Sequence, residues 1–149
     1  VQMMTKISSA TEKSHFDDYL CGPYTHDGER HHALAYTVCS LHFETHAKAA
    51  LIFTNSGESA RLISRHRPEL PIIALTKELK TQRQLALTWG VIPFLVPKSL
   101  RDHHLVKRGI KIMKEYKIVK DGDMVIVAGS MPFGKVNEMN HIRIIKVGE

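Results

Sequence analysis

Apolar and polar residues follow one another along this chain in blocks that predict alternating β-strands and α-helices. Short, almost uninterrupted apolar runs are typical of strands buried on both faces. Such runs occupy residues 50–54, 71–75, 91–95 and 123–128. Between them apolar residues recur at helical spacing, which predicts a helix in each interval. The expected helices cover residues 56–66, 78–88 and 102–117.

The two ends of the chain complete this pattern. The last apolar run, 141–147, follows a connection too short for a helical crossover, so it is expected to pair antiparallel with the strand before it. Residues 29–48 predict a packed helix, and a polar loop precedes them. The fold class is therefore α/β, a three-layer αβα sandwich around a mostly parallel five-stranded sheet with an antiparallel last strand.

Length and composition narrow the class of protein. A chain of 149 residues, 43% hydrophobic and 24% charged, is expected to form one main globular domain. No stretch approaches the roughly 20 continuous apolar residues of a membrane span, and the first residues lack the apolar core of a secretory signal. Cys21 and Cys39 are too few for a disulfide framework, and Cys39 is expected in the core. We expect a cytoplasmic protein with no membrane partner.

The net charge of +6 is concentrated in one segment, residues 98–120. That segment holds eight basic residues against Asp102 and Glu115. On a helix its Lys107, Lys111 and Lys114 would share one face. The surface is interpreted as a solvated helix face, with a surface that attracts phosphate or an acidic partner as the alternative. Nucleic acid is not expected as a partner, because no aromatic residues interleave with the charges.

A polar turn directly after the first strand is the leading candidate site. It consists of Thr54, Asn55, Ser56, Gly57, Glu58 and Ser59. As a structural device it would cap the next helix, with Asn55 as N-cap and Glu58 completing a capping box. As a functional device it would cradle a phosphate, with hydroxyl donors around a helix N-terminus and a glycine that lets the ligand approach the backbone. The carboxyl end of a parallel strand is also where open α/β sheets bind ligands.

A second candidate segment follows the strand at 123–128. Its polar and flexible positions are Gly129, Ser130, Gly134 and Lys135. Lys135 could reach a phosphate as a point charge. If the strands at 50–54 and 123–128 are neighbours, this loop lies beside the first turn and could serve as its lid.

Metal binding and catalysis are not expected from the remaining residues. His42 and His46 lie four apart on the predicted helix, but no third ligand is specified by spacing, and an HExxH motif is absent. No Cys–His arrangement supports nucleophilic catalysis. The predicted site set therefore contains no catalytic residue and no metal ligand.

An ordered series of motifs resembles the C-terminal domain of pyruvate kinase. The motifs are TNSGESARLISRHRP, PIIALT, TQRQLAL, WGVIPFLV, DGDMVIVAG and VNEMNHIRI. The resemblance runs from about residue 29 to 149, and it implies a division of the chain into two parts. Residues 1–20 would be the tail of the last helix of the family's barrel domain, and residues 21–149 the C-terminal domain.

The resemblance also implies a function. In this family the C-terminal domain binds allosteric sugar phosphates or nucleotides and contributes to the tetramer interface. The transfer of phosphate from phosphoenolpyruvate to ADP belongs to the (β/α)₈ barrel, which holds magnesium and potassium. We therefore expect a regulatory domain that has no cofactor of its own, is inactive alone, and has as partners a phosphorylated effector, the barrel of the same chain and further copies in a homo-oligomer.

Two departures from the family pattern shape the choice of ligand. The position of Glu58 is often basic in relatives, and a carboxylate opposes a phosphate dianion at close range. The region of residues 99–107 holds Arg101 but no tryptophan, which favours a monophosphate over a bisphosphate. The alternatives are a free-standing sugar-phosphate or nucleotide-binding protein, a module for an acidic partner, and a domain that serves assembly only.

Overall fold

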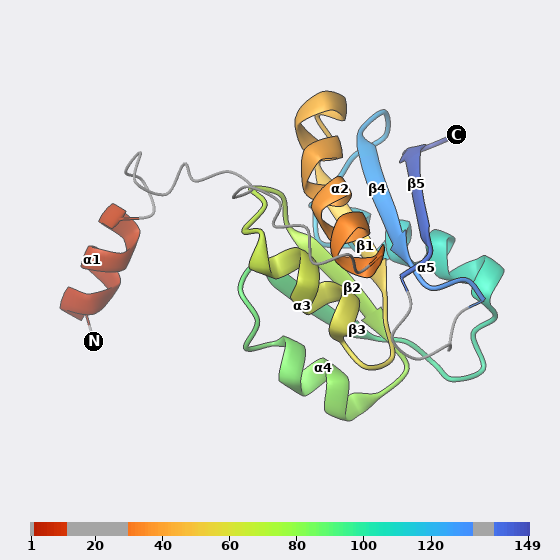
Figure 1. The fold of residues 1–149 in the computed structure, drawn as a ribbon, viewed down its shortest axis with the longest axis horizontal. Helices are drawn as coiled ribbons and strands as arrows, with labels where there is room; N and C mark the ends of the chain where they lie inside the picture. The colour runs from red at the N-terminus through yellow and green to blue at the C-terminus, as the bar shows by residue number, and fades with distance from the viewer. Residues whose placement is uncertain (1, 12–29, 133–138) are drawn as a thin grey trace.

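The structure, a computed structural model, describes residues 2–11, 30–132 and 139–149 and forms a sheet between two layers of helices (Figure 1). Its helices are α1 (Gln2–Thr11), α2 (Arg30–Thr45), α3 (Glu58–Arg65), α4 (Leu79–Leu85) and α5 (Asp102–Glu115). Its strands are β1 (Ala49–Phe53), β2 (Ile72–Thr76), β3 (Val91–Leu95), β4 (Met124–Gly129) and β5 (His141–Lys146). No helix in these ranges is both long and apolar enough to cross a membrane.

The strands form one five-stranded sheet in the order β3-β2-β1-β4-β5. β1 pairs in parallel with both β2 and β4, and β2 pairs in parallel with β3. β5 pairs antiparallel with β4, because the connection between them, residues 130–140, is too short for the helical crossover that parallel pairing requires. The expected fold class, including the antiparallel last strand, is confirmed.

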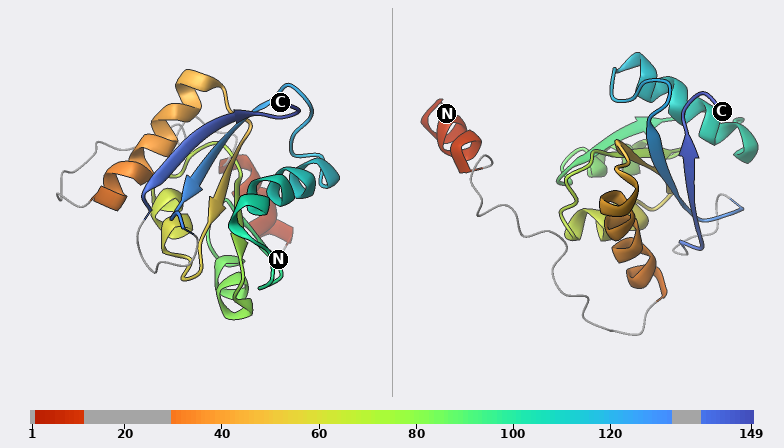
Figure 2. Two further views of the ribbon diagram at one scale, coloured as in Figure 1. Left: turned by 90° about the vertical axis from the view of Figure 1, so that its right-hand side faces the viewer. Right: turned by 90° about the horizontal axis from the view of Figure 1, so that it is seen from above.

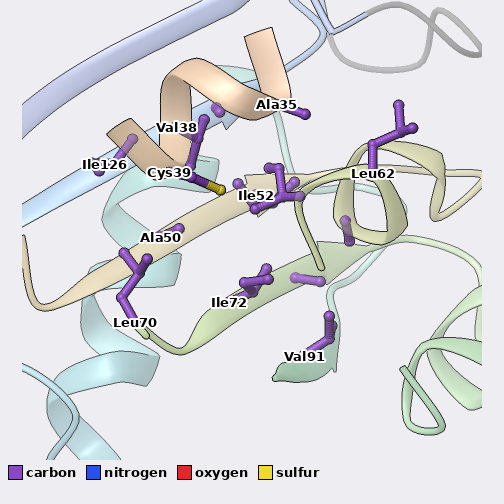
Figure 3. Close-up of a cluster of buried hydrophobic side chains, with 14 of the residues drawn as sticks. Ala35, Val38, Cys39, Ala50, Ile52, Leu62, Leu70, Ile72, Val91 and Ile126 are labelled. Carbon is purple, nitrogen blue, oxygen red and sulfur yellow. The ribbon is translucent and has the colours of Figure 1, made fainter. Parts of the chain in front are cut away.

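Helices cover the two faces of the sheet unequally. α2, α3 and α4 lie over one face, and α5 lies over the other, so that α2 and α5 appear on opposite sides of the sheet in Figure 2. Successive residues of β1 alternate between these layers, with Ile52 on the first side and Leu51 on the second. Figure 3 shows the first core, in which Cys39 of α2 points toward β1, as expected for a small core residue.

Gly109 sets how closely α5 approaches the sheet. A Cβ atom at this position would lie 2.5 Å from a methyl carbon of Leu51, which is fully buried in the centre of β1. The absent side chain therefore allows the helix axis to come close to the strand, and the rest of the apolar face of α5, including Leu105 and Met113, packs into the second core.

Some sequence expectations need correction or lie beyond the described residues. α2 ends at Thr45, and His46 has a φ of 52°, so His42 and His46 do not share a helix. α1 has no buried residue. The expected loop at about 18–28, Cys21 and the expected domain boundary at residue 20 lie outside the described residues.

Candidate functional site

The two candidate segments lie side by side at the carboxyl edge of the sheet. Phe53, the last residue of β1, is in register with Gly129, the last residue of β4. The strands approach so closely that a Cβ atom on Gly129 would lie 2.8 Å from the carbonyl oxygen of Phe53. Only glycine tolerates this contact, so Gly129 is needed to bring the turn at 54–59 next to the segment that begins at Ser130.

Hydroxyl residues end three neighbouring strands at this edge. Thr54 follows β1, Thr76 ends β2 and Ser130 follows β4, and all three are buried. The register pairs Phe53 with Leu75 and with Gly129, so the three hydroxyl residues fall at one level across the sheet. Thr76 was not among the predicted site residues, and it could have been found only with the strand order known.

The turn is held in shape by its own hydroxyl groups. The oxygen of Thr54 accepts a hydrogen bond from the N–H of Gly57 at 2.9 Å, and the oxygen of Ser56 accepts one from the N–H of Glu58 at 3.3 Å. Each hydroxyl keeps a proton that it can donate to a ligand. Gly57 has a φ of 85°, a left-handed conformation that glycine adopts without strain.

The predicted cap of the following helix is wrong. α3 begins at Glu58 with Gly57 as N-cap, and this N-cap residue makes no side-chain cap hydrogen bond, although the hydroxyl of Ser56 accepts a bond from the N–H of Glu58. Asn55 therefore does not serve as N-cap, and Glu58 does not complete a capping box. The reason is that the left-handed Gly57 turns the chain two residues later than the sequence pattern suggested. An uncapped helix start leaves backbone N–H groups without an intrahelical partner and presents the positive end of the helix dipole.

Arg61 is a residue of this site that the sequence analysis did not include. Its Nη2 donates to the carbonyl oxygen of Ser56 at 2.9 Å and lies 3.6 Å from a carboxylate oxygen of Glu58. The guanidinium thus folds back over the turn, and a Cβ on Gly57 would lie 2.8 Å from its Nη1. Arg61 offsets the negative charge of Glu58. Its position about one helical turn after Gly57 is the sequence feature from which its part in the site could have been predicted.

Asn55 provides the least expected feature of the turn. Its side-chain Oδ1 is buried and has no hydrogen-bond partner among the residues that the structure describes, while its backbone carbonyl oxygen accepts a bond from the hydroxyl of Thr81 at 2.6 Å. Thr81 belongs to α4, so this bond attaches the turn at 54–59 to α4. A buried acceptor without a donor is uncommon and costly in a folded protein.

The second segment is described only in its first part. Ser130 is buried, and Asn140 holds the next residue through two bonds: the N–H of Met131 donates to its Oδ1 at 2.8 Å, and its Nδ2 donates to the carbonyl oxygen of Met131 at 2.9 Å. Gly134 and Lys135 lie outside the described residues, so their predicted part in a lid remains a prediction.

No grouping of three or more His, Cys, Asp or Glu side chains that could hold a metal ion occurs within residues 2–11, 30–132 and 139–149. The groups that could contact a ligand at the carboxyl edge of the sheet are hydroxyl groups, backbone N–H groups, a guanidinium and an amide. Such groups bind anions and hydroxylated ligands.

Comparison with known proteins gives one family for this arrangement. Residues 32–145 match the family model described as pyruvate kinase, alpha/beta domain. The pyruvate kinase of Lactobacillus delbrueckii subsp. bulgaricus is 32% identical over 158 residues, which cover 99% of this chain and 26% of that protein. The pyruvate kinase of Mycobacterium tuberculosis is 30% identical over 150 residues, covering 100% of this chain and 31% of that protein.

A relative from Thermotoga maritima, also a pyruvate kinase, is 34% identical over 115 residues, covering 77% of this chain and 24% of that protein. The chain therefore spans between 24% and 31% of the length of these three relatives. The segment that matches the family model, residues 32–145, includes both the turn at 54–59 and the strand β4.

Proposed function

This chain belongs to the pyruvate kinase family through the alpha/beta domain of that family, and from this premise we propose that it binds a phosphorylated effector and takes part in assembly. The proposed ligand site is the turn at 54–59 with Arg61. The observation that carries the proposal is the uncapped start of α3, which lies beside two hydroxyl groups and a guanidinium. These groups together suit a phosphate monoester.

The unpaired Oδ1 of Asn55 supports a sugar phosphate over a bare phosphate. A carbonyl oxygen accepts a hydrogen bond, and a phosphate dianion has no proton to donate at neutral pH, whereas a sugar hydroxyl does. A ligand that places its phosphate on the start of α3 and a hydroxyl group on the Oδ1 of Asn55, once this buried side chain turns outward, would satisfy both the helix start and the amide oxygen. This pairing would also recover the free energy that the buried acceptor costs in the free protein.

Glu58 is compatible with this proposal because its ion pair with Arg61 is exposed. The two side chains are 44% and 39% exposed, and an ion pair of this kind contributes little to stability, about 0 to 1 kcal/mol. Arg61 can therefore exchange the carboxylate for a phosphate at small cost, while Glu58 turns toward solvent. The remaining repulsion between the carboxylate of Glu58 and a phosphate is consistent with a ligand that carries a single phosphate.

The test is a thermal unfolding titration of the full chain with glucose 6-phosphate, ribose 5-phosphate, AMP and fructose 1,6-bisphosphate. A ligand at about 100 times its dissociation constant should stabilise the protein by about 2.7 kcal/mol. Ser56→Asp places a carboxylate in the turn and should abolish this shift, whereas Ser9→Asp on the exposed helix α1 should not. A shift that survives Ser56→Asp would place the ligand elsewhere, and no shift with any ligand would contradict the proposal.

Phosphate transfer from phosphoenolpyruvate to ADP is proposed to take place outside this domain, in a barrel domain that holds magnesium and potassium. The support is the chain's short span of its relatives, together with the absence of a metal-capable cluster from the described residues. The chain alone is then expected to produce no pyruvate from these substrates in a coupled assay. Production of pyruvate above the rate without the protein would contradict this division of labour.

A further inference from the structure

The exposed face of α5 and the turn after it carry a dense group of positive charges. We call this group the α5 basic surface. It consists of Lys107, Arg108, Lys111, Lys114, Lys117 and Lys120, all of which are exposed. Because α5 rises about 1.5 Å per residue, Lys107 and Lys111 lie roughly 6 Å apart along the helix. The charges therefore form a stripe and not a cluster around one point.

Most of these charges are not balanced within the described structure. Lys114 forms an ion pair with Asp121, and Lys111 lies 4.0 Å from Glu115, at the limit of an ion pair. The other members of the α5 basic surface form no ion pair with any acidic residue that the structure describes. A stripe of uncompensated charge attracts an oppositely charged partner over about a Debye length, roughly 8 Å at physiological ionic strength.

The α5 basic surface is separate from the proposed effector site. α5 covers the face of the sheet opposite α3, and its last turn leads into the amino end of β4 (Figure 2). The turn at 54–59 follows the carboxyl end of β1, which runs parallel to β4. Lys114, Lys117 and Lys120 therefore lie toward the opposite end of the sheet from that turn.

The stripe ends in a concavity of about 360 Å³ that has both charged and apolar walls. Lys114, Lys117 and Lys120 line it together with Ile118, Val119 and Asp123. The carboxylate of Asp123 accepts a bond from the backbone N–H of Lys120 at 2.8 Å and is thereby committed to the turn. A concavity with an apolar wall and a cationic rim fits an apolar side chain that is flanked by carboxylates.

We propose that the α5 basic surface docks an acidic polypeptide segment that places an apolar side chain in this concavity. In an extended segment alternate side chains lie about 6.6 Å apart, close to the roughly 6 Å between Lys107 and Lys111 along the helix. The concavity then adds a hydrophobic contact at one end of the stripe. The interaction is expected to be fast, sensitive to salt and specific for this combination of charge and apolar anchor.

A nucleic acid fits the same surface less well. Single-stranded nucleic acids bind to basic grooves with free aromatic faces on which their bases stack. The exposed aromatic residue next to the stripe is Tyr116, whose ring packs edge-on against Phe94 with centroids 5.0 Å apart. Five of the six basic residues are lysines, which lack the planar fork that Arg uses for phosphates and base edges.

The test measures fluorescence anisotropy of a labelled synthetic peptide that alternates glutamate and serine and carries leucine near one end. The full chain is compared with Lys107→Glu/Lys111→Glu, which reverses two charges of the stripe. The matched control, Lys80→Glu/Arg83→Glu, makes the same change on the exposed face of α4. We expect about a tenfold loss of affinity in the first variant and less than a twofold change in the control, since only the first variant replaces two attractive charges of the stripe with repulsive ones.

Two further probes decide the identity of the partner. Replacing the leucine of the peptide by serine should weaken binding severalfold, because the concavity then loses its apolar contact. A single-stranded oligothymidine of equal charge should bind more weakly than the peptide. Equal loss in both protein variants, no effect of the leucine, tighter binding of the oligonucleotide, or no binding of the peptide would each overturn the proposal.

Discussion

At the scale of single residues, Asn55 lowers the stability of the fold but suits the proposed ligand site. Its buried Oδ1 lacks a partner, and leaving a buried acceptor unpaired costs about 1–3 kcal/mol. A substitution that removes this atom would relieve the cost, so stability alone does not explain an amide at this position. Unsatisfied buried polar groups in native proteins call for a specific explanation, and a ligand is one.

Asn55→Ala is therefore expected to leave the free energy of unfolding unchanged or to raise it by up to about 1 kcal/mol. The same substitution should reduce the stabilisation by the sugar phosphate that binds the unaltered protein. Urea unfolding with and without that ligand measures both effects. Asn140→Ala is the contrasting variant, because it removes two satisfied hydrogen bonds and should lower stability by about 1 kcal/mol. Equal losses in both variants would contradict this reading of Asn55.

Gly109 is a second position where one residue decides the packing. Alanine is favoured over glycine inside a helix by about 1 kcal/mol, yet here its Cβ would lie 2.5 Å from the buried side chain of Leu51. Overpacking of a core costs about 1–3 kcal/mol. We expect Gly109→Ala to lower the free energy of unfolding, as measured by urea denaturation. In that background Leu51→Ala should cost less than it does in the unaltered protein, and additive effects would argue against the clash.

At the scale of elements, the sequence predicted the strands well and the cap of α3 wrongly. Burial on both faces makes β1, β2 and β4 almost continuously apolar, and this signal depends on composition alone. The start of α3 depends on the backbone conformation of Gly57, which the side-chain pattern does not reveal. Asn55 and Glu58 have the right residue types and spacing for a capping box, but the chain turns too late for them to form one.

The candidate site was predictable in part for a similar reason. The turn at 54–59 could be identified because its residues are contiguous in the sequence. Arg61 and Thr76 could not, because their relation to the turn depends on a side-chain conformation and on the order of the strands. The position of Gly129 beside Phe53 was predicted only on the condition that β1 and β4 are neighbours, and the strand order meets that condition.

His66, the residue directly after α3, has a perturbed pKa. Burial lowers the pKa of His66 below its usual value of 6.5, and the nearby His32 and Arg65 lower it further. Its ring also packs edge-on against Tyr36 of α2, with centroids 5.8 Å apart. Below pH 6.5 the unfolded chain therefore binds a proton at this position more readily than the folded protein does, so protonation favours unfolding.

We expect the free energy of unfolding to fall as the pH drops from 6.5 toward the lower pKa of folded His66, and this contribution to level off below that pKa. His66→Gln removes the titrating group and should flatten this part of the curve. Urea unfolding at a series of pH values measures the slope for both proteins. His103→Gln is the control, because His103 is exposed on α5. A slope that survives in His66→Gln but vanishes in His103→Gln would contradict the assignment.

At the scale of the whole molecule, the two edges of the sheet differ. β3 contains Pro93, which has no N–H to offer to another strand, and proline is one of the features that protect edge strands from pairing. β5 has six residues and no proline, and its outer side is not covered by another strand of the described structure. An open edge of this length invites a second strand, which makes β5 a candidate surface for the proposed assembly.

We therefore expect the chain to form a dimer in which β5 pairs antiparallel with β5 of a second copy. Closed two-fold symmetry follows naturally from such a pairing, because each copy presents the same strand. Light scattering after size exclusion should give twice the mass of 16.9 kDa at high protein concentration. Ile144→Lys adds a charge in the middle of this edge, which the two-fold axis would bring close to its copy, and like charges opposed in a sheet are destabilising.

The same substitution on the other edge provides the control for this last prediction. Ile92 lies on β3 and is 41% exposed, so Ile92→Lys adds an equal charge and should cost little stability. If β5 forms the interface, Ile144→Lys shifts the dimer toward monomer and Ile92→Lys does not. Loss of the dimer only in Ile92→Lys would move the interface to β3, and a monomer at all concentrations in the unaltered chain would contradict the prediction.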